Sequence, residues 1–124
     1  MDFKNRQDIH KVIISFYDKL LADPKISFFF DHIHADDLPH HLDRVADFWN
    51  QILFGGDGYQ GNPMRPHIIL NKRIEFKRDH FDIWLNHFTK TIDDSHQGEL
   101  AEEMKSRANT IARVMELKMN QLKK

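Results

Sequence analysis

Four side chains in this sequence could together bind a metal-containing ring and a ligand on its metal. His41 and His67 lie on either side of a Gly- and Pro-rich stretch, and Tyr17 and Trp84 lie on separate amphipathic segments. One imidazole can bind iron, apolar side chains can enclose a flat ring, and a phenol and an indole can donate hydrogen bonds above the open iron position. The combination predicts a haem site that binds a diatomic gas.

Each of the four residues also has an ordinary structural interpretation, and the residue types alone leave both open. His67 could be a histidine at a loop-to-helix junction, and His41 a solvated histidine at a helix edge. Tyr17 could reach water with its hydroxyl, and Trp84 could be a core residue. Pro66 limits the helix that carries His67 to a short piece, because proline is tolerated only in the first turn. An iron ligand at this position would therefore be held by the loop.

The elements that position these residues are predicted to be helices. Apolar residues recur at helical spacing, and no segment shows the alternation typical of a strand. A short aromatic turn is expected at Ile26–Phe30 and a loop at Gly55–Pro66, while Asp93–Ser95 offers an N-cap to the last helix. The fold class is therefore all-α, with one domain spanning residues 1–124. The helices are expected over residues 8–21, about 37–53, about 74–91 and 100–122.

The second expected helix carries an apolar stripe that would face a pocket. Val45 and Phe48 follow His41 at helical spacing, so the imidazole shares their face of the helix. His40 points about 100° away around the helix axis. We therefore expect His40 to be exposed and not to face the same pocket as His41.

The bulk properties exclude several classes of function. The chain has 124 residues, no cysteine and a formal net charge of -1. Without cysteine there is no disulfide or thiolate metal site, and a near-neutral charge gives no field that attracts nucleic acid or an anionic membrane. No segment approaches the length of an apolar membrane span, and the first residues carry no secretory signal. We expect a soluble, cytoplasmic protein with no nucleic-acid and no membrane partner.

Two other classes of protein remain as alternatives. The nine histidines could serve a non-haem metal, and His80 and His87 share one helix face, although a solvated face is the simpler interpretation. The Glu-x-x-His pairs of di-iron bundles and the His-Glu-x-x-His motif are absent from the sequence. The other alternative is a haem-free helical domain that serves in interaction or sensing.

Several motifs follow one another in a specific order along the chain. They are Phe16-Tyr17, Phe30, His41, Ala46-Asp47-Phe48-Trp49, Tyr59-Gln60-Gly61-Asn62-Pro63 ahead of His67, and Phe81-Asp82-Ile83-Trp84-Leu85. Each motif is weak alone, but their order and spacing together resemble the group III truncated haemoglobins over essentially the whole chain. The double-glycine motif between the first two helices, typical of the other truncated groups, is absent, which favours group III.

The resemblance implies a globin-like two-on-two helical sandwich around a haem of b type. It would bind O2, NO and CO reversibly at a His-ligated iron. Strong distal donors would slow oxygen release, so we expect ligand redox chemistry or detoxification with an unidentified reductase, such as nitric oxide dioxygenase- or peroxidase-like activity, rather than bulk transport. The roles that the resemblance implies are His67 as proximal iron ligand, Phe30 as ring-stacking residue, Tyr17 and Trp84 as distal donors, His41 as distal or gating histidine, and Val45 and Phe48 as pocket lining.

Overall fold

The computed structural model describes residues 1–55, 67, 70 and 75–122 of the 124-residue chain. The regular structure in these residues is entirely helical, which confirms the predicted fold class. Most of the expected loop, from residue 56 to residue 66, lies outside the described residues. The elements are α1 (Arg6–Ala22), the 3-10 turn η1 (Ser27–Phe30), α2 (Leu38–Phe54), α4 (Arg78–Ser95) and α5 (Glu99–Leu122).

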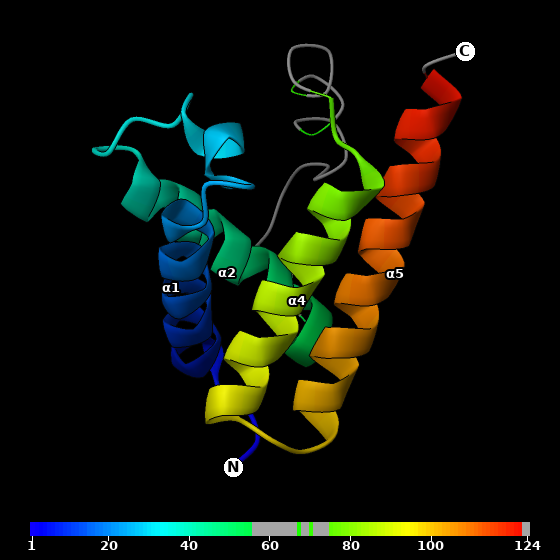
Figure 1. The fold of residues 1–124 in the computed structure, drawn as a ribbon. Helices are drawn as coiled ribbons and strands as arrows, with labels where there is room; N and C mark the ends of the chain where they lie inside the picture. Colours follow the sequence, from blue (N-terminus) through cyan, green and yellow to red (C-terminus); the bar gives the residue numbers. More distant parts are fainter. Residues whose placement is uncertain (56–66, 68–69, 71–74, 123–124) are drawn as a thin grey trace.

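The helices pack as two pairs around a shared core. Helix α1 packs mainly on α2, α4 packs on α5, and α1 also contacts α4. Helices α4 and α5 run side by side in opposite directions, and α2 crosses behind α1 and α4 in the view of Figure 1. Side chains at the centre of the core are at most 1% exposed, among them Phe16, Leu20, Phe88, Ile92 and Met104.

Local capping chemistry sets two of the helix boundaries. Gly55 ends α2 with φ at +83°, a conformation that favours glycine. Helix α4 begins at Arg78 rather than near residue 74, because residues 75–77 are not helical. The backbone N–H of Lys77 donates to His80 Nδ1 at 3.0 Å and so closes the first turn of α4. The predicted start of this helix was therefore too early.

The N-terminus of the last helix, α5, is capped by a residue near the start of the chain, so the predicted cap was wrong. The segment Asp93–Ser95 forms the last turn of α4 and does not cap α5. Instead, the Asp2 carboxylate accepts hydrogen bonds from the backbone N–H groups of Leu100 and Ala101 at 2.8 and 2.9 Å. Gly98 makes room for it, because a Cβ at this position would lie 2.6 Å from the Asp2 side chain. The prediction was wrong because the cap depends on a contact across nearly the whole chain.

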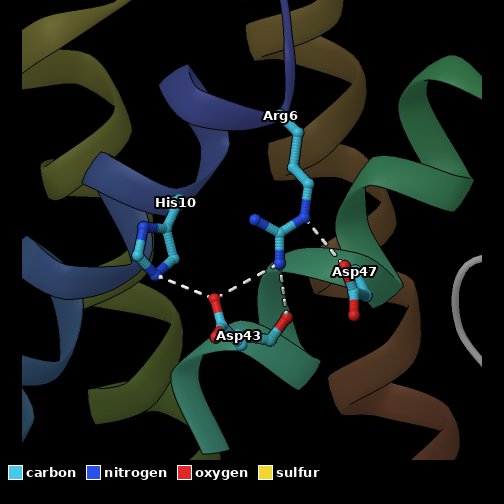
Figure 2. Close-up of polar contacts among 4 residues, drawn as sticks. All are labelled: Arg6, His10, Asp43 and Asp47. Carbon is cyan, nitrogen blue, oxygen red and sulfur yellow. Dashed lines mark hydrogen bonds and ion pairs between the residues drawn. The ribbon is translucent and has the colours of Figure 1, made fainter. Parts of the chain in front are cut away.

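A polar cluster ties the first half of α1 to α2. Figure 2 shows Arg6 and His10 of α1 facing Asp43 and Asp47 of α2. Arg6 Nε donates to the Asp47 carboxylate at 2.8 Å and Arg6 Nη2 to the Asp43 carbonyl at 3.0 Å, while His10 Nε2 lies 3.4 Å from the Asp43 carboxylate. These side chains are partly exposed, so each pair contributes little free energy. The two carboxylates lie on a different face of α2 from the apolar stripe, so these polar contacts join α2 to α1 without entering the core.

Replacing Asp2 with alanine is expected to lower the free energy of unfolding by about 1 kcal/mol. Two backbone N–H groups of α5 lose their acceptor, and the helix N-terminus loses a favourable negative charge. Asp2→Asn keeps one oxygen acceptor and should lose less. Urea unfolding followed by far-UV circular dichroism measures the difference. Asp36→Ala, at an exposed aspartate, is the matched control, and an equal loss in both alanine variants would contradict the capping role.

Candidate functional site

The helices surround an open cavity of about 600 Å³, a size typical of sites for cofactors and other small molecules. Every residue predicted for the site lines this cavity. Their positions around one cavity are observed, whereas the individual roles that the resemblance implies stay predictions. These lining residues are Tyr17, Phe30, His41, Val45, Phe48, His67 and Trp84.

A hydrogen bond inside the cavity joins α1 to α2. Tyr17 Oη lies 2.9 Å from His41 Nε2. The Tyr17 ring is buried and makes edge contacts with the rings of Phe16 and Phe30, which fix its direction. Burial raises the pKa of the Tyr17 phenol well above its ordinary value. The hydroxyl therefore stays protonated and can act as a hydrogen-bond donor.

The imidazole of His41 is held in its neutral form. Burial is the largest cause that lowers the pKa of His41 below 6.5, and electrostatic repulsion by His32, His67 and Arg44 lowers it further. A neutral imidazole carries one N–H. With the proton on Nε2, His41 donates to Tyr17 Oη and leaves the Tyr17 O–H free for a ligand. With the proton on Nδ1, the phenol donates to His41 instead, so the tautomer of His41 decides what Tyr17 offers.

Trp84 forms another wall of the cavity, from α4. Its ring stacks on Phe88 with the centroids 5.2 Å apart and meets the ring of Phe16 edge-on at 5.5 Å. These two contacts hold the plane of the indole. Because an indole has a donor and no acceptor, Trp84 can offer only an N–H to a ligand in the cavity.

His67 and Phe30 approach the cavity from segments outside the long helices. His67 is half-buried, and its ring lies 6.0 Å from that of Phe76, which in turn stacks on Phe29 at 4.3 Å. Phe30 lies in η1 and faces Tyr17 edge-on at 5.5 Å. The short turn η1 therefore contributes both to the support of His67 and to the cavity wall. Residues 56–66, which include the expected Pro66 turn, lie outside the described part of the chain.

The residues that line the cavity but were absent from the predicted site include three exposed basic side chains. His40 was expected to face away from the pocket, but it lines the cavity together with His41. It is exposed, so it contributes to the opening of the cavity rather than to its interior. Arg44 and His32 also line the cavity and are exposed. Because Arg44 follows His40 by one helical turn, helical periodicity could have identified it as a cavity residue. His32 lies in an irregular segment, for which periodicity makes no prediction.

The two histidines considered for a surface metal have separate partners. His80 packs edge-on against Phe28 and Phe29, and His87 Nε2 lies 2.8 Å from the Asp23 carboxylate. In the described parts of the chain, no group of three or more His, Cys, Asp or Glu residues is placed to hold a metal ion. Among the helices described here, none is long and apolar enough to cross a membrane.

Comparison with known proteins identifies the family. The model of the bacterial-like globins matches residues 5–120. The chain belongs to this family. It is 26% identical over 111 residues to the group 3 truncated haemoglobin of Campylobacter jejuni. The aligned region covers 87% of this chain and 85% of the relative.

Solved structures of globins confirm the predicted group and its two-on-two fold. The crystal structure of group III truncated haemoglobin from Campylobacter jejuni has a TM-score of 0.85 at 25% identity and covers 96% of this chain and 95% of its own. The 2/2 haemoglobin from Synechococcus sp. PCC 7002 has a TM-score of 0.77 at 21% identity and covers 91% and 92%, which supports the fold alone.

Membership of the globin family implies haem as the cofactor, and the cavity fits such a group. Its volume and largely aromatic lining suit a flat macrocycle, and His67 supplies an imidazole of the kind that holds haem iron in globins. Arg44, His40 and His32 at the opening suit the carboxylates on the edge of a haem. The residues present therefore match the cofactor that the family implies.

His41 is expected to make the stability of this globin depend on pH. The pKa of His41 in the folded protein lies below 6.5. At a pH between this value and the pKa in the unfolded chain, the imidazole is protonated in the unfolded chain and neutral in the folded protein. The contribution of neutral His41 to the free energy of unfolding is fully present above pH 6.5. It is lost as the pH falls through the pKa that His41 has in the folded protein. Urea unfolding between about pH 8 and 5 should show a steeper loss in the wild type than in His41→Gln.

His34→Gln is the matched control for this titration, since His34 is exposed and does not line the cavity. Its curve should follow that of the wild type. Parallel curves for the wild type and His41→Gln would show that burial does not depress the pKa of His41.

Proposed function

We propose that this globin binds O2, NO and CO reversibly at a haem iron held by His67, and that it serves redox chemistry on the ligand rather than bulk oxygen transport. The observation that carries the proposal is the 2.9 Å hydrogen bond between Tyr17 and His41, in a cavity that His67 also lines. A protonated phenol and a separate imidazole around one largely apolar cavity match the needs of a polar ligand on iron.

Five further lining residues are proposed to hold the ring. When bound, the haem, which we take to be of b type, supplies an iron whose open position takes a diatomic ligand. Phe30 would stack against the ring, and Val45 and Phe48 would supply apolar contacts from α2. Arg44 and His40 would pair with the propionates at the opening, since charge-assisted hydrogen bonds to carboxylates are the stronger kind.

Tyr17 and Trp84 are proposed as the donors to the ligand, and His41 as the residue that orients Tyr17. A hydrogen bond to a charged group contributes roughly 1.5–3 kcal/mol, and each 1.4 kcal/mol is about a factor of ten in affinity. Two such donors would retain a ligand with negative charge for a long time. Slow release suits the turnover of nitric oxide or peroxide better than oxygen delivery. This turnover consumes electrons, so we propose an unidentified reductase as the protein partner.

The role of His67 can be tested by absorption spectroscopy. With haem supplied, the wild type should give a Soret band that shifts on reduction with dithionite and again with carbon monoxide. His67→Ala should lose or alter this band because the iron loses its imidazole, and free imidazole should restore it. His34→Ala, at an exposed site outside the cavity, is the control. A wild type that takes up no haem specifically would refute the proposed function.

Tyr17→Phe and Trp84→Phe are each expected to raise the rate of oxygen dissociation by about tenfold, because each removes one donor and keeps an aromatic ring. Stopped-flow displacement of oxygen by carbon monoxide measures this rate. Dissociation of carbon monoxide, which is a weaker hydrogen-bond acceptor, is the internal control and should change less. Unchanged oxygen rates in both variants would exclude these residues as donors.

A further inference from the structure

Both tryptophans of this chain stack on one phenylalanine ring. The sequence contains two tryptophans, Trp49 and Trp84. Trp84 lies 5.2 Å from Phe88 between ring centroids with planes 8° apart, and Trp49 lies 5.2 Å from the same ring with planes 28° apart. The Phe88 ring therefore connects an indole of α4 to an indole of α2.

The stack lies at the cavity, and two of its three rings are buried. Trp49 and Trp84 both line the cavity, so each indole borders the space in which a ligand would react. Phe88 is fully buried, and Trp49 is 3% exposed. Trp84 is partly exposed. A charge on this stack would therefore be shielded from bulk water at Phe88 and Trp49, while small molecules in the cavity could reach Trp84.

Indole and phenol are the side chains that give up a single electron most readily. They differ because an oxidised phenol must also lose its proton, whereas an oxidised indole can keep it. A phenol that loses an electron becomes a strong acid, so Tyr17 would have to pass its proton to His41 Nε2, 2.9 Å away. An indole can keep its proton and carry the positive charge. That charge would lie against the face of Phe88, where a cation is attracted by the ring quadrupole.

We propose that the Trp84–Phe88–Trp49 stack supplies one electron to hydrogen peroxide reduced in the cavity. Reduction of one peroxide to two water molecules breaks the O–O bond and consumes two electrons and two protons. One electron would leave the tryptophan pair, which would become a cation radical in contact with Phe88. The other electron would come from the bound haem, so both the pair and the haem must then be re-reduced. The protons come from solvent. This inference rests on the proposed haem function.

The stack would act as a one-electron store inside the protein. Because Trp49 is buried, the store does not serve as a surface at which large substrates are oxidised. Two one-electron reductions by a small reductant such as ascorbate would regenerate the indole pair and the haem. The store would also spare Tyr17, which otherwise is the oxidisable group hydrogen-bonded in the cavity.

Electron paramagnetic resonance of the ferric, haem-loaded protein, frozen shortly after peroxide is added, tests the proposal. The wild type is prepared in three forms: unlabelled, with indole-deuterated tryptophan and with ring-deuterated tyrosine. The expected result is a protein radical whose signal narrows with labelled tryptophan only. Phe88→Leu and Trp49→Phe should each lower the radical yield by about fivefold, the factor that one face-on cation–aromatic contact represents.

Phe3→Leu is the matched control, since Phe3 is also buried but lies outside the cavity lining, and it should leave the yield unchanged. Mass spectrometry of the same samples should find oxidised tryptophan at positions 49 and 84. A signal that narrows with labelled tyrosine, or a yield equal in the wild type and Phe88→Leu, would overturn the inference while leaving the haem function intact. A wild-type Soret band that does not respond to peroxide would overturn both the peroxide chemistry and this inference.

Discussion

The need to keep a cavity of about 600 Å³ open governs the rest of this structure. A chain of 124 residues has little core to spare, and unfilled apolar space costs stability roughly in proportion to its volume. Contacts outside the cavity, rather than contacts across it, must therefore hold the helices together. The Asp2 cap stabilises the start of α5, and the polar contacts of Arg6 join α1 to α2. Large rings such as Phe16 and Phe88 fill the space between the helix pairs.

Burial also sets the protonation states of Tyr17 and His41, the two hydrogen-bonded polar groups that face the cavity. It raises the pKa of Tyr17 and lowers that of His41, so both side chains are neutral near pH 7. A charged imidazole or a phenolate at this depth would be costly to desolvate. The two neutral groups can instead exchange the roles of donor and acceptor across 2.9 Å, which lets one hydrogen bond adapt to ligands of different polarity.

The sequence allowed the helices and seven of the cavity-lining residues to be predicted, because periodicity reports which face of a helix is apolar. Val45 and Phe48 were found in this way, and the order of the motifs placed Tyr17, His67 and Trp84 around the same cavity. The Asp2 cap could not be predicted, since it joins residues at opposite ends of the chain. His40 was misplaced because a helical-wheel argument treats a pocket as one face, whereas an open cavity also includes the side chains around its opening.

Trp84 can serve two purposes because they use different parts of its ring. The indole N–H lies in the ring plane, and a hydrogen bond to a ligand would be made along that plane. The contact with Phe88 uses the face of the ring, with planes 8° apart. Face stacking therefore leaves the in-plane donor unobstructed, and it also holds the donor in a fixed direction. A side chain that donates a hydrogen bond to a ligand and also supplies an electron to it needs this separation, and an indole provides it where a phenol, whose oxidation requires loss of its only donor proton, does not.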